Sequence, residues 1–423
     1  MSATDVIKEW KKRNPQIENI VLFVCNALRW DYAPESVLSR GIAFKTIASG
    51  IMTCASFPSI ITGLYPQHHG VHSFHGRIPK GTSSLLKLYG YNTSLWTGNI
   101  LGFDPPESAL LYRLLRHRNR VSLEDLDPPF IYLEDHRGGH CPYGWSADDE
   151  EYEPWDCMSF FRDFGIKGER ALRKRYQEGI QISAREFDDR MRVIDERGLA
   201  DETLVVFLSD HGELLGKRGG VVGHGNITVP EVVYVPTVFI HSDLPKGKSF
   251  EQEGVLRHVD LYPTICDLLG RRVTTKVSGV SLLDVKKLPH LGFTYFMERR
   301  KRARLNYEIK EASVWDKDGG FMFREGNSLP LLLFRAFYVT ALCKTCINAI
   351  YRRQRLRRSP KALKNYIKLL KYFCSSFTKY GSPSFSLEKA KFFVKQICKS
   401  RIEDAKKERI KRIVNKLKSE GKI

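Results

Sequence analysis

Short, almost continuous apolar runs alternate with helical patterns along the first 290 residues of the chain. Runs of this kind are typical of strands that are covered on both faces of a sheet. The alternation of such strands with helices predicts an α/β fold with a mostly parallel central sheet. The five runs that we expect to form strands are Ile20–Cys25, Thr93–Trp96, Phe130–Leu133, Leu204–Leu208 and Pro236–His241.

Two stretches show the three- to four-residue spacing of apolar side chains that predicts helices. The longer one runs from Leu172 to Ile194, and Gly198 stands just beyond it. The second is Val259–Leu269, and it is followed directly by Gly270, a residue type that often ends helices.

The sequence changes in character after residue 290. An apolar stretch at 328–351 contains Arg335 and Lys344, and two charges inside it count against a membrane-spanning helix. We expect a helix that is docked on the protein or lies in a membrane interface instead. Amphipathic patterns with a basic polar side follow at Lys361–Cys374 and around Ile410–Leu417.

The formal charge divides at the same place. The chain carries 68 Lys and Arg against 48 Asp and Glu, a net charge of 68 − 48 = +20. From Leu291 onward there are 33 basic and 11 acidic residues, so this part carries 33 − 11 = +22 and the rest carries 20 − 22 = −2. We therefore expect a nearly neutral body at residues 1–290 and a basic, mainly helical C-terminal extension at residues 291–423.

Several uses of this basic extension stay open. Its helices could pack on the body and keep a solvated basic face, or they could dock on anionic lipid at a membrane surface. Nucleic acid is not expected as a partner, because no recognised nucleic-acid-binding motif accompanies the charge. The sequence does not define an oligomeric state.

The N-terminus and the nine cysteines indicate the cellular compartment in which we expect the protein. Met1–Asn14 is polar and lacks the apolar core of a signal peptide. Together with an odd number of scattered cysteines, this predicts buried thiols in a reducing compartment. Cys343 and Cys346 have no second ligand pair nearby, so they do not predict a zinc site. The expected location is cytoplasmic, and peripheral on the inner membrane face if the extension binds lipid.

Candidate site residues follow the predicted strands, because the carboxyl ends of parallel strands meet at one edge of a sheet. An Asp beside a His behind a buried strand is costly unless the pair is neutralised or binds a cation. Asp210 and His211 are therefore candidate ligands of a divalent metal, with a capping Asp and a hydrogen-bonded His as the alternative. The polar strings that follow the first, third and fourth strands are Asn26–Asp31, Glu134–His140 and Ser209–Glu213, with His224 beyond the last.

Two hydroxyl residues, Thr53 and Ser56, open a helical stretch that contains Pro58. A hydroxyl beside a metal and a helix N-terminus can lose its proton and attack an anionic ester. The same helix end would attract a phosphate or sulfate oxyanion.

Six motifs occur in the order in which one known family carries them. On these motifs, residues 19–284 resemble the sulfatase-like branch of the alkaline phosphatase superfamily. The resemblance implies a three-layer α/β sandwich with a mostly parallel central sheet. The motifs are LRWDY at 28–32, TGLYPQHHG at 62–70, GGHCPY at 138–143, SDHGE at 209–213, His224 behind a glycine-rich loop, and HVDLYPT at 258–264.

The resemblance also implies a metal site and a nucleophile. Members hold one divalent cation, which could be Ca, Mg, Mn or Zn, and the matching positions here are Asn26, Thr53, Asp210 and His211. Counting back ten residues from the Thr-Gly pair of the second motif selects Thr53 as the nucleophile. Ser56 is a rival, because its surroundings are similar to the nucleophile string of nucleotide pyrophosphatases.

Three further residues are candidates for contact with the substrate. His140 and His224 correspond to family residues that contact the substrate oxyanion or help the leaving group, and an ordinary histidine pKa of ~6.5 suits such a role. Arg29 could add positive charge to the substrate site, with a structural ion pair to Asp31 as the alternative.

The chain departs from the family pattern in two places. Sulfatases convert a Cys or Ser within a Cys-x-Pro-x-Arg motif to formylglycine, but here Thr53, Ala55 and Phe57 occupy that motif and Cys54 is one position off. Formylglycine is therefore not expected. Asn26 replaces the usual acid, which removes one negative charge from the metal site.

The expected function is a metal-dependent hydrolase of sulfate or phosphate esters that uses Thr53 as its nucleophile and takes an anionic ester as its substrate. Two alternatives stay open. One is a transferase that moves a phospho group to a lipid-linked or polysaccharide acceptor. The other is a binding protein of the same fold that is catalytically impaired, because Asn26 weakens the metal site.

Overall fold

A computed structural model of the protein describes residues 1–13, 16–97, 110–144, 152, 156–218, 220–302, 305–325, 329–330, 332–333, 367–368 and 370–399. Most of the apolar stretch at 328–351, the pair Cys343 and Cys346, and the tail around 410–417 lie outside the described residues, so the statements about them stay predictions.

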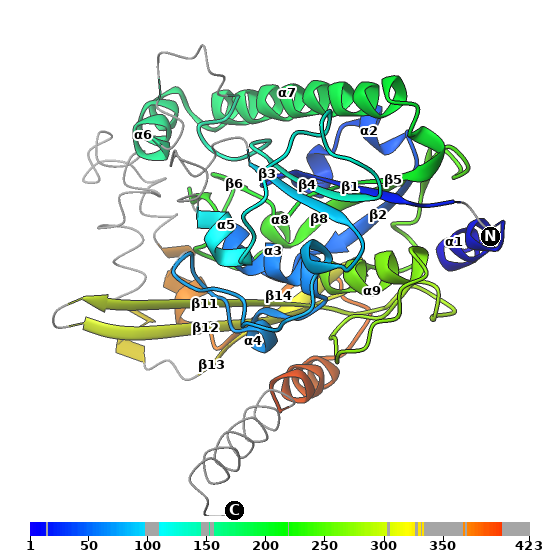
Figure 1. Cartoon of the computed structure of the whole chain (residues 1–423). Coiled ribbons are helices and arrows are strands. Elements are labelled where there is room, and N and C mark those ends of the chain that lie inside the picture. Colours follow the sequence, from blue (N-terminus) through cyan, green and yellow to red (C-terminus); the bar gives the residue numbers. More distant parts are fainter. Residues whose placement is uncertain are drawn as a thin grey trace, which may run out of the picture.

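The body is built on an eight-stranded sheet (Figure 1). Its strands are β1 (Asn19–Cys25), β2 (Ile42–Ile47), β3 (Asn92–Thr97), β4 (Phe130–His136), β5 (Thr203–Leu208), β8 (Tyr234–Ile240), β9 (Lys248–Ser249) and β10 (Leu256–Arg257). They follow the order β10–β2–β8–β5–β1–β4–β3, and β9 pairs with β2. Only β8 runs against its neighbours β5 and β2, so the sheet is mostly parallel, as the sequence predicted.

All five predicted strands are present, and their ends differ from the predictions by a few residues. β4 extends to His136, so Glu134 and Asp135 belong to this strand and not to the loop beyond it. β2 was not predicted, because Lys45 interrupts its apolar run.

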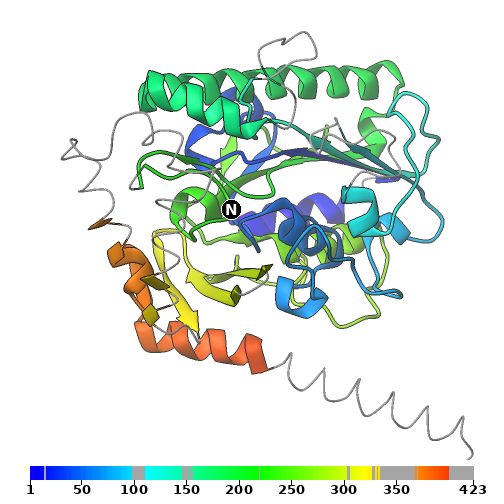
Figure 2. The ribbon, with the colours of Figure 1, turned by 90° about the vertical axis from the view of Figure 1, so that its left-hand side faces the viewer.

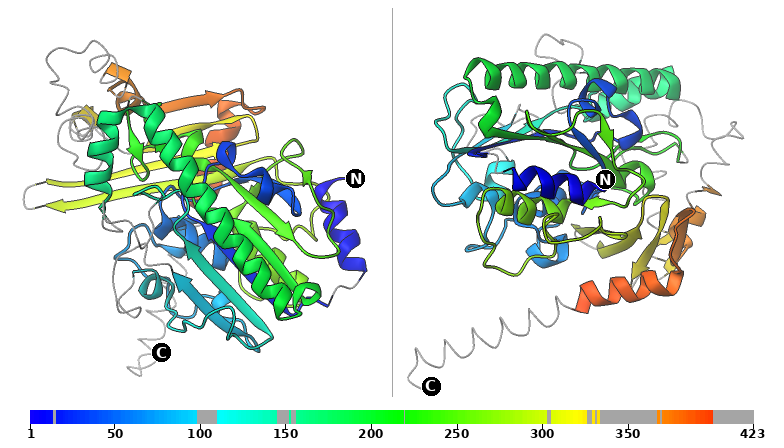
Figure 3. Two further views of the ribbon diagram at one scale, coloured as in Figure 1. Left: turned by 90° about the horizontal axis from the view of Figure 1, so that it is seen from above. Right: turned by 90° about the vertical axis from the view of Figure 1, so that its right-hand side faces the viewer.

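Helices cover both faces of the sheet and complete three layers, as the resemblance implied (Figures 1 and 3). The long α7 (Glu169–Glu196) crosses one face, whereas α3 (Thr53–Thr62) and α9 (His258–Leu268) lie on the other. The spacing of apolar residues correctly predicted α7 and α9.

Side chains along β1 divide between the two cores by simple alternation. Ile20, Leu22 and Val24 pack in the core beneath α3 and α9, and Val21 and Phe23 pack in the core beneath α7. The same alternation in β4 matters for the site. Ile131 and Leu133 face the α3 side, and two residues further along the same face is Asp135.

A second, antiparallel sheet follows the body (Figure 2). Its strands, in spatial order, are β11 (Gly292–Arg302), β12 (Leu305–Trp315), β13 (Gly319–Glu325) and β14 (Phe377–Gly381). The prediction of a mainly helical extension is therefore wrong for these residues. The strands bury alternate side chains such as Phe293 and Tyr295, so the period is two and not the helical 3.6.

The second sheet packs on the segments that lead into and out of the site. The backbone N–H of Tyr295 donates to the Ser49 carbonyl at 2.9 Å, four residues before Thr53. The buried carboxylate of Glu311 accepts from Thr228 Oγ1 at 2.8 Å and pairs with Arg324 at 3.0 Å. The second sheet therefore helps to position the site.

Cys141 and Cys157 form a disulfide, so the prediction that the cysteines are thiols is wrong for this pair. Cys25, Cys54 and Cys266 are buried free thiols, as predicted, whereas Cys374, which was expected to be buried, is exposed. Burial raises the pKa of Cys54 to about 12, which keeps this neighbour of Thr53 protonated and unreactive.

Candidate active site

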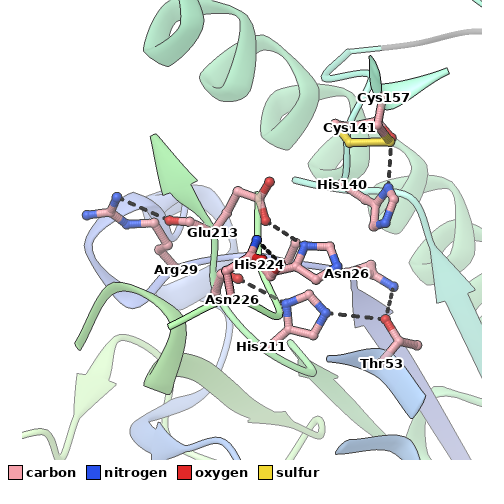
Figure 4. Close-up of polar contacts among 12 residues, drawn as sticks. Asn26, Arg29, Thr53, His140, Cys141, Cys157, His211, Glu213, His224 and Asn226 are labelled. Atoms are coloured by element: carbon pink, nitrogen blue, oxygen red, sulfur yellow. Dashed lines mark hydrogen bonds and ion pairs between the residues drawn. A yellow bond between two sulfur atoms is a disulfide. The ribbon is translucent and has the colours of Figure 1, made fainter. Parts of the chain in front are cut away.

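The loops after β1, β2 and β5 meet at one edge of the central sheet, because these strands run in the same direction. β1 ends just before Asn26, β2 leads to Thr53 at the first turn of α3, and β5 leads to Asp210 and His211. The structure therefore brings the four predicted metal-binding residues together in one buried cluster, of which Figure 4 labels Asn26, Thr53 and His211.

The Thr53 hydroxyl lies between an amide and an imidazole. Its Oγ1 accepts a hydrogen bond from Nδ2 of Asn26 at 3.3 Å and lies 3.3 Å from Nε2 of His211. Nδ1 of His211 is 2.9 Å from the carbonyl oxygen of Gly212, which can only accept, so Nδ1 carries the proton. Nε2 of His211 is thus free to accept a proton from Thr53 or to bind a cation.

Asp210 is held in place by backbone groups. Its Oδ1 accepts from the N–H groups of Ala27 at 3.0 Å and His211 at 2.9 Å. Ala27 has a φ of 58°, a left-handed conformation that an alanine adopts only when its surroundings impose it. Burial outweighs the attraction of Asp210 and lowers the pKa of His211 to about 4, so this imidazole is neutral near pH 7.

Three buried oxygen atoms in the cluster have no hydrogen-bond partner among the described residues. They are Oδ1 of Asn26, Oδ2 of Asp135 and Oδ2 of Asp210. Burial, and then the nearby Asp210, raise the pKa of Asp135 well above its ordinary value. Unpaired carboxylate oxygens are costly in a dry interior, but they are the donors that a divalent cation prefers. The residues present therefore fit the metal that the family implies, and the mixture of oxygen with an imidazole nitrogen leaves its identity open.

A histidine pair lies beside His211. The ring centroids of His211 and His224 are 4.2 Å apart, and those of His224 and His140 are 5.1 Å apart. Glu213 accepts from Nδ1 of His224 at 2.8 Å and from the Tyr143 hydroxyl at 2.6 Å, so both of its oxygens have a donor. The pair thus lies close enough to the cluster to contact a substrate bound at Thr53.

The pKa values of the two predicted catalytic histidines are shifted in opposite directions. Burial alone would lower the pKa of His224, but the Glu213 carboxylate outweighs it and the pKa is raised above its ordinary value. Burial and the neighbouring His224 lower the pKa of His140 well below that value. His224 is therefore the better proton donor of the two.

In the described part of the chain, two other groups of side chains are close enough together to share a cation, with one ligand atom from each residue within 4.8 Å of the others. The first group is His211, Glu213 and His224, and the second is His140, Cys141 and Cys157. In the first group the glutamate oxygens are already hydrogen-bonded, and in the second the two sulfurs form a disulfide. Both groups therefore suit a metal less well than the cluster around Thr53.

Two predicted residues are engaged elsewhere. The guanidinium of Arg29 pairs with Asp31 at 2.5 and 2.8 Å and points away from Thr53 (Figure 4), which favours the alternative of a structural ion pair. The Ser56 hydroxyl donates to the Gly50 carbonyl at 3.2 Å, one turn into α3. Thr53 is thus better placed than Ser56 to act as the nucleophile.

The glycine pair before His140 has a packing reason. Gly138 has a φ of 50°, and a Cβ on Gly139 would lie 2.8 Å from the carbonyl oxygen of Ala27. The N–H of Gly139 donates to the Asn26 carbonyl at 2.7 Å. The loop that leads to His140 therefore crosses directly over the end of β1, where no larger side chain fits.

The sequence did not assign roles to Asp135 and Glu213, although both lie in the strings that follow predicted strands. A usable signal existed for Asp135, which shares its face of β4 with Ile131 and Leu133 and must therefore be buried. No sequence signal connects Glu213 with its partners His224 and Tyr143, because the loops alone bring these residues together.

The fold and the site define an α/β protein of the alkaline phosphatase-like class. A 2-O GAG sulfatase superposes with a TM-score of 0.56 at 16% identity, covering 86% of this chain and 95% of that one. The phosphonate monoester hydrolase of Agrobacterium radiobacter gives a TM-score of 0.54 at 15% identity, covering 84% of this chain and 96% of that one. These two likenesses show the fold.

Sequence comparison gives the family. The sulfatase family model matches residues 130–271. The low-salt glycan biosynthesis sulfotransferase Agl7 of Haloferax volcanii is 30% identical over 394 residues, which cover 88% of this chain and 89% of that protein. The chain belongs to the sulfatase family.

Proposed function

We propose that the protein is a metal-dependent enzyme that transfers the sulfate group of an ester to a hydroxyl group of a glycan, with Thr53 as the nucleophile. The observation that carries this proposal is the buried Thr53 hydroxyl, 3.3 Å from Nε2 of His211, in a cluster of unpaired oxygen atoms. Similarity along most of the chain to a protein named as a glycan biosynthesis sulfotransferase supports sulfate as the group transferred and a glycan as the acceptor.

In the first step, Oγ1 of Thr53 forms a bond to sulfur while the bond between sulfur and the leaving alcohol oxygen breaks. The proton of Thr53 passes to a water molecule, because Nε2 of His211 and Oδ2 of Asp210, which lie 3.3 Å apart, would hold the cation and Nδ1 of His211 is already protonated. The products are the free alcohol and a sulfate ester on Thr53. The free N–H groups in the first turn of α3 stabilise the negative charge of the transferred sulfate group.

The leaving alcohol oxygen needs a proton, and His224 is suited to supply it. Nδ1 of His224 is bonded to the Glu213 carboxylate, which leaves Nε2 available to donate. His140 lies beside this ring and can contact a substrate oxygen. Glu213 orients His224 and stabilises its positive charge, as a carboxylate does for a catalytic histidine.

The second step releases the ester from Thr53. A threonine has a single hydroxyl and cannot expel the sulfate by itself, so an external hydroxyl must attack the sulfur while the bond between sulfur and Oγ1 of Thr53 breaks. The proton of the attacking hydroxyl passes to Nε2 of His224, which restores that residue, and the Thr53 oxygen regains its proton from water. A glycan hydroxyl gives transfer and water gives hydrolysis. Similarity to the glycan biosynthesis sulfotransferase supports transfer, and hydrolysis is the second candidate because of the sulfatase family model.

A divalent cation would act on the nucleophile and on the transferred group. The residues that would hold it are Asn26, Thr53, Asp210 and His211, which lie together in the buried cluster. When bound, it would lower the pKa of the Thr53 hydroxyl and neutralise charge on the sulfate group.

The proposal is tested by incubation with p-nitrophenyl sulfate in the presence of a divalent cation, with and without an acceptor sugar. We expect release of p-nitrophenol together with formation of sulfated sugar, and slower release from the phosphate analogue. Chelation of the cation or Thr53→Ala should abolish both products. Equal rates for Thr53→Ala and the wild type would refute the nucleophile, and p-nitrophenol without sulfated sugar would favour the hydrolase.

We also propose that the basic C-terminal part docks the enzyme on the anionic cytoplasmic face of a membrane. A helix at residues 387–399 buries Ala390 and Val394 but exposes Lys391, Lys395 and 63% of Phe392. An apolar ring flanked by lysines is typical of helices that bind anionic lipid surfaces. Within the described ranges, no helix is both long and apolar enough to cross the bilayer.

A further inference from the structure

We infer that Asp135 supplies, through Asn26, the negative charge that the metal site lacks at position 26. The inference rests on the proposed metal-dependent function and names a positioning residue for it. It also explains how a chain with an amide in place of the usual acid can hold a cation.

The positions of the two residues follow from strand register. β1 and β4 are adjacent and parallel, with Val24 opposite Asp135 and Cys25 opposite His136. Asn26 follows directly after β1, so the two side chains meet at the same edge of the sheet. Nδ2 of Asn26 donates to Oδ1 of Asp135 at 3.1 Å, and the same amide group donates to Thr53 at 3.3 Å.

The neighbouring acid of β4 shows what an ordinary buried carboxylate requires in this fold. Glu134 points to the opposite face, where Arg190 donates to both of its oxygens at 2.8 and 3.0 Å and the Tyr132 hydroxyl donates at 3.0 Å. Asp135 is fully buried, yet its Oδ2 has no partner. Glu134 is thus neutralised within the protein, and Asp135 is not.

The cluster around Thr53 consequently holds two buried acids and lacks a balancing cation. Asp210 accepts only from backbone N–H groups on Oδ1 and lies near the neutral His211 on Oδ2. Among the described residues, no Lys or Arg forms an ion pair with Asp135 or Asp210. Two such carboxylates in a dry interior are strongly destabilising until a positive charge joins them.

The geometry gives Asp135 an indirect role. Its contact is with the amide nitrogen of Asn26, which fixes the orientation of that amide and makes Oδ1 a stronger donor for a cation. Carboxylates that act on a metal ligand in this way commonly contribute 10- to 100-fold in affinity, by order of magnitude.

The test is titration of the full-length, metal-free protein with Mg²⁺, Ca²⁺, Mn²⁺ and Zn²⁺ by calorimetry, for the wild type and three variants. Asp135→Asn should weaken binding of the preferred cation by roughly 10- to 100-fold. The exchange variant Asn26→Asp with Asp135→Asn restores the charge and should recover most of this loss. Glu134→Gln is the matched control, and it should lower the unfolding temperature but leave the cation affinity unchanged.

A second readout separates this role from a merely structural one. If Asp135 serves the cation, Asp135→Asn should raise the unfolding temperature of the metal-free protein, because one unpaired acid is removed, and should reduce the rise that the cation causes. A structural hydrogen bond to Asn26 would instead predict a lower unfolding temperature without the metal.

The outcomes are distinguishable from those of the proposed function. Wild-type affinity in Asp135→Asn, no recovery in the exchange variant, or no binding of any of the four cations by the wild type would overturn the inference. Cation binding that follows Asp135 as expected supports it even if no sulfate transfer is found, in which case the proposed function alone fails.

Discussion

Nδ1 of His224 is bonded at 2.8 Å to the buried carboxylate of Glu213, eleven residues earlier in the chain. The short β6–β7 hairpin (β6, Leu214–Leu215; β7, Val222–Gly223) joins the two residues and brings them face to face. This ion pair raises the pKa of His224 above its ordinary value, against the effect of burial. In the proposed mechanism the pair therefore favours protonated His224 as the donor to the leaving group.

Glu213→Gln should slow proton donation by His224 to the leaving group without slowing the attack by Thr53. The variant keeps an acceptor for Tyr143 but removes the charge that holds the proton on His224. We expect kcat/KM for a sulfate ester of an alkyl alcohol to fall by about 10²- to 10⁴-fold, the usual contribution of a general acid. For p-nitrophenyl sulfate, whose leaving group needs no proton, the rate should change little. Equal losses on both esters would contradict the assignment, and the exposed Glu196→Gln serves as the control.

His69 should make the stability of the protein depend on pH. It is buried, with Ser59 Oγ 3.2 Å from its Nε2 and the Val71 N–H donating to its Nδ1, and burial lowers its pKa well below the ordinary value. Below about pH 6.5 the unfolded chain binds a proton that the folded chain does not. The free energy of unfolding should therefore fall with decreasing pH, by up to about 1.4 kcal/mol per pH unit for this residue.

Urea unfolding across the range from neutral to mildly acidic pH checks this expectation. In His69→Gln the slope of unfolding free energy against pH should decrease, because one proton fewer is taken up on unfolding. The variant should also be less stable at neutral pH. The same change at the exposed His75 should leave the slope as it is in the wild type. A slope that is unchanged in His69→Gln would show that His69 does not contribute.

Arg29→Met should affect stability and not substrate binding. The variant loses the pair with Asp31 and the contact of Nη1 with the Glu213 carbonyl, so the free energy of unfolding should fall by about 1–3 kcal/mol. KM for the sulfate ester should stay within error of the wild type. A large rise in KM at unchanged stability would instead support the role in substrate binding that the sequence predicted.

The exposed helix at 387–399 offers a direct test of membrane docking. The triple variant Lys391→Glu, Phe392→Ser and Lys395→Glu should largely abolish sedimentation with vesicles that contain anionic lipid, because it removes both the positive charge and the apolar ring. A control with Lys246→Glu and Lys248→Glu changes the charge equally at two other exposed positions. Equal binding by the two variants would refute docking through this helix.

The strands of the body could be predicted because burial on both faces leaves a sequence signal that does not depend on distant residues. β2 escaped prediction because Lys45 breaks its apolar run, and only the fold explains how that lysine is accommodated. Its Nζ reaches the Lys317 carbonyl at 2.6 Å, from a segment far along the chain. The strands β11 to β13 were missed for a related reason, since their many charged side chains concealed a period of two.

The site was predicted in part. The order of the motifs identified four candidate metal ligands, and the structure places them in one cluster. They are Asn26, Thr53, Asp210 and His211. The partners that complete the site could not be predicted, because nothing in the sequence shows that Asp135 meets Asn26 or that Glu213 meets His224. Those contacts depend on strand register and loop path, which are properties of the fold as a whole.

Covalent capture of the sulfate group provides the most direct test of Thr53. The protein is mixed with a divalent cation and p-nitrophenyl sulfate carrying a radioactive sulfur atom, quenched rapidly in acid and digested, and the labelled peptide is sequenced by mass spectrometry. We expect the label on Thr53 in the wild type, its accumulation when no acceptor sugar is present, and no label in Thr53→Ala. Turnover by Thr53→Ala, or a label on Ser56, would contradict the mechanism.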